Sequence, residues 1–134
     1  MAVNAPQLNA RSLDTKRQLL TALARVFDLL GWLAPFTVVA KILMQKLWTR
    51  GIKWDEVIPK DISASWISWK RQCTPMTEIK VQRSLRIPPE NRREQVQLHT
   101  FCDASEVAYG AVVYLKVKGE NGMYLTNITV AKSG

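Results

Sequence analysis

The stretch FCDASEVAYGAVVY, residues 101–114, decides how the second half of the chain folds, because an acidic residue stands between two apolar runs. Asp103 follows the first run, small residues suited to a turn come next, and a second run begins at Gly110. Asp103 itself has three open interpretations. It is a carboxylate that holds a metal ion in a nuclease, the aspartate of a protease, or the first residue of a turn.

The residues around this stretch predict an antiparallel meander of three strands. VQLHTFCD (96–103), GAVVYLKVK (110–118) and MYLTNITVAK (123–132) have strand patterns. The tetrapeptide GENG joins the last two strands, and its Asn-Gly pair is typical of tight hairpins. A sheet of this kind has a face to cover and no helix follows it, so we expect a truncated domain.

Helical periodicity predicts three helices before the sheet. The first begins at Thr15, which forms a capping box with Gln18, and it stops at Gly31. The second runs from Pro35 to about Arg50, and the third runs from about Asp61 to Cys73.

The apolar positions of these helices predict one core. We expect the core to include Leu23, Phe27, Trp32, Leu43, Leu47, Trp66 and Trp69. Val39 and Ile42 belong to the predicted stripe of the second helix, with Phe36 at its start. Trp54, in the loop that follows the second helix, is expected to pack against the second and third helices.

The predicted fold class is α+β, with a helical segment first and an antiparallel meander second. Residues 1–14 are predicted to be a flexible lead-in, 15–75 the helical segment, 76–95 a connector and 96–134 the strands.

Composition and charge restrict the partners. The net charge of +8 favours polyanions such as nucleic acid. The longest apolar run, residues 29–40, is too short to span a bilayer, and no signal peptide opens the chain, so we expect no membrane partner. Cys73 and Cys102 lack metal-ligand spacing and indicate reduced thiols in an intracellular protein, cytoplasmic or nuclear and not secreted.

Two stretches together resemble a known family. VFDLLGWLAPFTVVAKILMQKLWTRGIKWDEVIP, residues 26–59, resembles a segment of the Pol polyproteins of BEL/Pao-type LTR retrotransposons, with Leu29 where the family usually has proline. FCDASEVAYGAVVY resembles the start of the ribonuclease H domain that follows the reverse transcriptase there. The resemblance covers roughly residues 11–133. It implies that 15–75 correspond to the thumb and connection, and 96–134 to an incomplete ribonuclease H-like fold.

The resemblance also implies a role for Asp103. This residue matches the first-strand aspartate that binds Mg²⁺ in the complete ribonuclease H domain, and the next carboxylate comes from a helix after the third strand. We therefore expect Asp103 to be a catalytic metal ligand by ancestry whose partners are missing, and the isolated fragment to bind no metal and to be inactive. Glu106 is expected to be a solvated turn residue.

Other chemistries have weaker support. An aspartic protease needs Asp-Thr-Gly or Asp-Ser-Gly, and here Ala104 and Ser105 follow the aspartate, so the peptidase interpretation is disfavoured. His99 and Cys102 are three apart in a strand, so their side chains point to opposite faces.

Two functions follow as hypotheses. In the first, the chain is part of a reverse transcriptase and ribonuclease H polyprotein, works with the remainder of that polyprotein, and handles RNA–DNA hybrid. Contacts to phosphates would come from Arg17, Lys41, Lys46, Arg50 and Lys53, which are equally suited to solvated helix faces. In the second, it is a non-catalytic remnant that binds nucleic acid or protein. The five tryptophans could stack on bases, but Trp66 and Trp69 fall on the predicted core stripe, which favours core packing for them.

Overall fold

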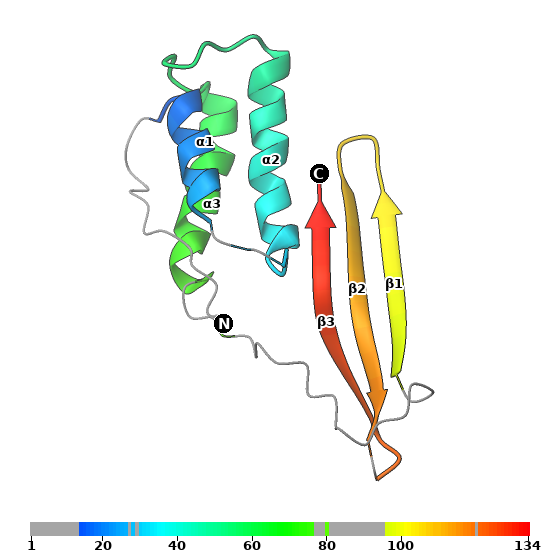
Figure 1. Cartoon of the computed structure of the whole chain (residues 1–134). Helices are drawn as coiled ribbons and strands as arrows, with labels where there is room; N and C mark the ends of the chain where they lie inside the picture. The colour runs from blue at the N-terminus through cyan, green and yellow to red at the C-terminus, as the bar shows by residue number, and fades with distance from the viewer. Residues whose placement is uncertain (1–13, 27, 29, 77–79, 81–95, 120) are drawn as a thin grey trace.

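Three helices and a three-stranded antiparallel sheet lie side by side in the computed structural model (Figure 1). The structure describes residues 14–26, 28, 30–76, 80, 96–119 and 121–134. The elements are α1 (Lys16–Arg25), α2 (Ala34–Thr49), α3 (Lys60–Met76), β1 (Val96–Ala104), β2 (Tyr109–Lys118) and β3 (Tyr124–Ser133). The α+β prediction is confirmed. Most of the predicted lead-in and of the predicted connector lies outside the described residues.

The start of α1 follows from its capping box, and its end differs from the prediction. Thr15 accepts from the amide of Gln18, whose side chain returns the bond to Thr15 N. The helix ends at Arg25 rather than near Leu30, because Val26 has an extended backbone. Asp28 Oδ2 then accepts from Leu33 N at 2.7 Å, which holds the chain in a turn ahead of α2. The predicted core residue Phe27 lies outside the described residues.

The buried face of α2 is rotated from the predicted stripe. Val39 was expected in the stripe but is 43% exposed, and Ile42 is half-buried. The buried positions are Ala34, Phe36, Thr37, Ala40, Leu43, Met44 and Leu47. Because Ala40 is small, it lets the neighbouring helices approach this face closely.

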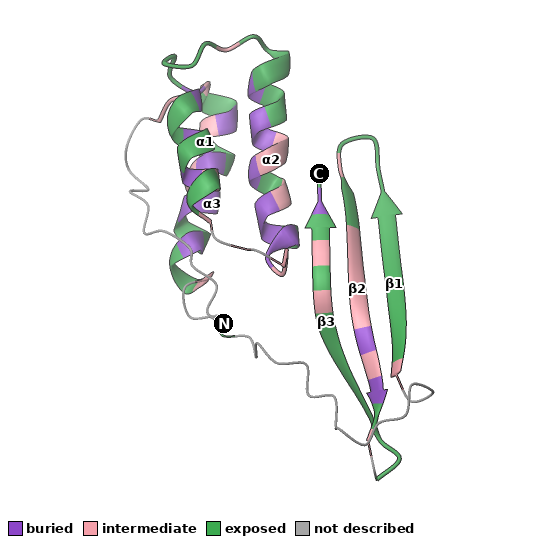
Figure 2. Cartoon of the chain, viewed as in Figure 1, coloured by how far each residue is buried: buried purple, intermediate pink, exposed green. Residues whose placement is uncertain are grey.

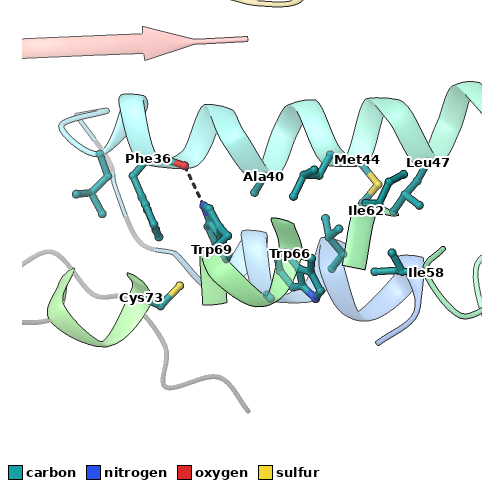
Figure 3. Packing of buried hydrophobic residues seen from close by; sticks show 13 residues of the cluster. Phe36, Ala40, Met44, Leu47, Ile58, Ile62, Trp66, Trp69 and Cys73 are labelled. Carbon is teal, nitrogen blue, oxygen red and sulfur yellow. Dashed lines mark hydrogen bonds between the residues drawn. The ribbon is translucent and has the colours of Figure 1, made fainter. Parts of the chain in front are cut away.

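The core lies among the three helices and is centred on α3 (Figure 3). Trp66 and Trp69 are almost completely buried, and their rings stack with centroids 5.1 Å apart. Trp69 also stacks on Phe36 at 4.7 Å, and its indole N–H donates to Phe36 O at 2.9 Å. The predicted roles of both tryptophans are therefore confirmed. Burying one such ring stabilises the fold by about 2–3 kcal/mol.

A buried ion pair ties the start of the chain to α3. Lys70 Nζ donates to Asp14 Oδ2, and both side chains are almost fully buried. Trp66 Nε1 donates to the same carboxylate oxygen at 2.7 Å. Removing one member of such a pair leaves the other charge buried without compensation.

The sheet has the order β1-β2-β3, as the sequence predicts. β1 pairs antiparallel with β2 over its whole length, and β2 pairs with β3 with a register shift at Val113/Tyr114. The hairpin between β2 and β3 closes with Gly119 N donating to Met123 O at 2.7 Å, and Gly122 has φ +77. Among the described strands, β1 thus lies at one edge of the sheet.

The end of β3 docks on the helical layer. The sequence did not predict this contact between the sheet and the helices. Ala131 N donates to Leu30 O at 2.7 Å, and Lys41 Nζ donates to Ser133 O at 2.6 Å. Ser133 Oγ donates to Ala34 O at 3.2 Å. Gly31 has φ +74, and a Cβ there would lie 1.6 Å from Ala131 O, so only glycine permits this approach.

Burial differs sharply between the two layers (Figure 2). The facing sides of the helices are buried, whereas most of the sheet is exposed. Leu115 and Val117 of β2 are buried, but every residue of β1 after Val96 is exposed.

Candidate functional site

Asp103 lies near the end of β1, opposite Gly110 of β2, and is exposed. Its Oδ1 accepts from the amide of the next residue, Ala104, at 2.9 Å. The turn that follows is held by Ser105, whose Oγ donates to Ala108 O at 3.1 Å and accepts from Ala108 N at 3.3 Å. Ser105 thus makes the hydrogen bonds that close the turn, and the Asp103 carboxylate, which bonds the amide of Ala104, is exposed.

An open pocket of about 580 Å³ lies between the start of α2 and the sheet, with Asp103 in its lining. Trp32 and Val38 line it from the helical layer, and Phe101 and Tyr114 line it from the sheet. The two sheet aromatics form an edge-to-face pair with centroids 5.9 Å apart. The pocket is thus mainly apolar and carries a carboxylate, which are features of sites for small ligands or bases.

The described residues do not by themselves fit a magnesium site. Within them, no three His, Cys, Asp or Glu side chains gather closely enough to hold a metal ion. Glu106 is exposed in the turn and does not line the pocket. A pair of Mg²⁺ ions needs several hard oxygen ligands, and Asp103 offers one carboxylate.

Neither cysteine forms a thiol–histidine pair with His99 in the described part of the chain. His99 Nε2 lies 3.1 Å from Gln97 Oε1 on the exposed surface. Cys102 is on the opposite face of β1, as expected from the spacing. Cys73 is buried in the helical core, and this burial raises the pKa of its thiol from 9.0 to about 11. Cys73 is therefore protonated and unreactive at neutral pH.

The five predicted phosphate contacts are spread over the helical layer, and none lines the pocket that holds Asp103. Arg17 pairs with Asp55 at 2.8 Å, and Arg50 pairs with Asp61 at 2.6 Å. The hydrogen bonds to these arginines lower the pKa values of both carboxyls. The side chains of Arg17, Arg50 and Lys41 therefore have intramolecular partners. Lys46 and Lys53 are exposed.

The five tryptophans divide into two classes. Trp66 and Trp69 are core residues, and Trp32 is half-buried beside the core. Trp48 and Trp54 are exposed and contact each other, so Trp54 packs on α2 at the surface and not in the core. Lys16, which the sequence analysis missed, lies under both rings. The signal that could have found it is its place on the apolar stripe of α1, three residues before Leu19.

In the described part of the chain, no helix has the length and apolar character needed to cross a membrane.

The family model described as "Pao retrotransposon-like RNaseH-like domain" matches residues 15–134. The match spans all six helices and strands, from α1 to β3. No curated protein and no solved structure matches the chain significantly.

Proposed function

The chain belongs to the Pao retrotransposon-like RNaseH-like domain family, and on that premise we propose that it handles RNA–DNA hybrid during reverse transcription. It does so as part of a BEL/Pao-type Pol polyprotein, with the helical layer in the reverse transcriptase thumb and connection and the sheet at the start of the ribonuclease H domain. The hybrid is an intracellular substrate, so the proposed location is the cytoplasm or the nucleus.

The observation that carries the proposal is the position of Asp103. Its carboxylate is exposed at the end of the first strand, it lines an open pocket, and Ser105 holds the neighbouring turn in its place. An exposed carboxylate in the lining of an apolar pocket is accessible to a ligand.

The proposed role of Asp103 is one Mg²⁺ ligand in the intact polyprotein. The described residues lack the other ligands, so the proposal gives no hydrolytic step to this chain alone. The further carboxylates come from the remainder of the Pol polyprotein.

The exposed surface of the sheet is suited to binding another part of the polyprotein. Leu98 and Leu125 are more than half exposed, and among the described strands β1 pairs with β2 on one side alone. An exposed apolar edge strand invites pairing with another strand. We assign this surface to the remainder of the Pol polyprotein.

The test uses Asp103→Asn in a longer polypeptide that continues through the rest of the ribonuclease H domain. We expect Mg²⁺-dependent cleavage of the RNA strand of a hybrid to fall to background. Asparagine keeps the size of the side chain but lacks the negative charge that neutralises divalent ions. The circular dichroism spectrum should not change, because the side chain is exposed and asparagine keeps an oxygen that can accept from Ala104 N.

Glu106→Gln is the matched control, since it removes the same charge three residues away in the exposed turn. This variant should cleave like the native protein. Full cleavage by Asp103→Asn would exclude a metal-binding role for Asp103. It would favour the second candidate function, a non-catalytic module that binds nucleic acid or protein.

A further inference from the structure

Two tryptophans are exposed at one end of the helical layer, outside the core. Trp48, at the end of α2, is 55% exposed, and Trp54, in the α2–α3 loop, is 39% exposed. Their ring centroids lie 5.4 Å apart with an interplanar angle of 88°, an edge-to-face contact. Paired large aromatics on the surface of a small protein mark a site for a partner.

Lys16 holds this pair in place from below. The residue is only 6% exposed, and its Nζ lies 4.0 Å from the Trp48 ring centroid and 5.0 Å from that of Trp54. The same Nζ donates to Ile52 O at 3.1 Å, and Arg17 N donates to Trp54 O at 3.0 Å. The loop is therefore fixed to the start of α1, and a ligand that stacks on Trp48 orders few additional groups.

The surroundings of the pair are positively charged. We define the loop end as residues 46–61 together with Lys16 and Arg17; Figure 1 shows this loop passing over one end of the helices. The loop end holds six cationic side chains and three carboxylates. Two of the cations are neutralised in the Arg17–Asp55 and Arg50–Asp61 pairs. The surplus is carried by Lys16 and by three exposed lysines, Lys46, Lys53 and Lys60.

We propose that the loop end binds single-stranded nucleic acid, with one base stacked on Trp48 and the adjoining phosphates beside the exposed lysines. Lys16 occupies one side of the Trp48 ring, and the base takes the exposed side. Every base has a π-face, so the site is tolerant of sequence, and the phosphates make it sensitive to salt. A duplex keeps its bases stacked inside and offers none to Trp48.

A protein partner fits this surface less well. Lysine is depleted in the cores of protein interfaces, and here Lys16 lies against both rings while three exposed lysines belong to the same loop end. The inference shares a nucleic-acid partner with the proposed function, but it needs neither Asp103 nor a metal ion. Its test can therefore be run with EDTA present.

The test is a fluorescence anisotropy titration of a labelled oligothymidylate with the 134-residue chain in EDTA. We expect Trp48→Ala to weaken binding by about tenfold, because it removes the stacking surface. Trp48→Phe keeps an aromatic face and should retain most of the affinity. Val39→Ala is the control, an exposed apolar residue nine positions earlier on α2, and it should bind like the native chain.

A second pair of variants tests the charge. Lys53→Gln should reduce the salt dependence by about one released ion. Lys118→Gln, on the sheet, removes the same charge and should have a smaller effect. Equal binding by native chain and Trp48→Ala, absence of binding by the native chain, or tighter binding of duplex than of single strand would each overturn the inference. Those results leave the Asp103 test unaffected, so the two proposals fail separately.

Discussion

The helical layer and the sheet differ in what they bury and in the charge they carry. Trp66 in the helical layer is 1% exposed, whereas Phe101 in the sheet is 59% exposed. Residues 96–134 contain three lysines and three carboxylates, whereas residues 14–76, which include the helices, contain ten lysines and arginines and five carboxylates. The helical layer thus holds its own core and attracts polyanions, while the sheet offers a neutral, partly apolar surface to a neighbour.

The largest effect expected from this difference is on stability. Trp66→Ala should lower the free energy of unfolding by about 3–5 kcal/mol, because it opens a cavity and removes the indole donor to Asp14. Phe101→Ala should cost about 1 kcal/mol or less, since this ring is mostly in water and contacts Tyr114 at its edge. Denaturant unfolding followed by circular dichroism measures both. Equal losses would mean that the sheet has as much of a core as the helices.

The next effect concerns the junction of the two layers. Gly31→Ala should separate β3 from Leu30, because a Cβ would lie 1.6 Å from Ala131 O. Gly51→Ala is the matched control, since Gly51 also has positive φ (+68) but open space around its Cβ position. Both variants share the cost of the left-handed backbone, and we expect Gly31→Ala to lose about 1–3 kcal/mol more.

Hydrogen exchange of the Ala131 amide locates this loss. The amide donates to Leu30 O in the native chain, and it should exchange faster in Gly31→Ala than in Gly51→Ala. Unchanged protection in Gly31→Ala would mean that the junction does not hold the sheet on the helices.

The smallest effect separates the two cysteines by pH. Burial raises the pKa of Cys73 from 9.0 to about 11, so between these values the unfolded chain releases a proton that the folded chain keeps. Stability should therefore fall as pH rises from about 9 to about 11, and Cys73→Ala should remove part of that fall. Cys102→Ala, at an exposed position, should leave the slope unchanged. If stability falls equally with rising pH in the native protein and in both variants, Cys73 is accessible to water.

Sequence reasoning succeeded where local interactions decide the structure. The capping box of Thr15 and Gln18, the tryptophan positions of α3 and the three-strand meander depend on residues close in the chain. It placed the end of α1 too late, because Asp28 caps the turn ahead of α2. It also placed Val39 on the apolar stripe of α2, since the rotation of α2 is set by Ala40 and the helices packed there.

The sequence predicted only those residues of the candidate site that the sheet contributes. Asp103 at the end of a strand follows from the alternation of residues around it, and that position is confirmed. The pocket could not be predicted, because Trp32 and Val38 come from a segment about 70 residues earlier. The burial of Lys16 and Lys70 was also missed, since each depends on partners, the paired tryptophans and Asp14, that only the fold brings near.

The docking of β3 has a consequence for the order in which the chain folds. Ser133 and Ala34 hydrogen-bond across a separation of 99 positions, whereas the Asp14–Lys70 bond within the helical layer spans 56 positions. Closing a long loop costs more entropy than closing a short one, and distant contacts form slowly. The helical layer is complete by residue 76, so during translation it can fold before the strands have emerged from the ribosome. The last residues of β3 then lock two preformed parts together.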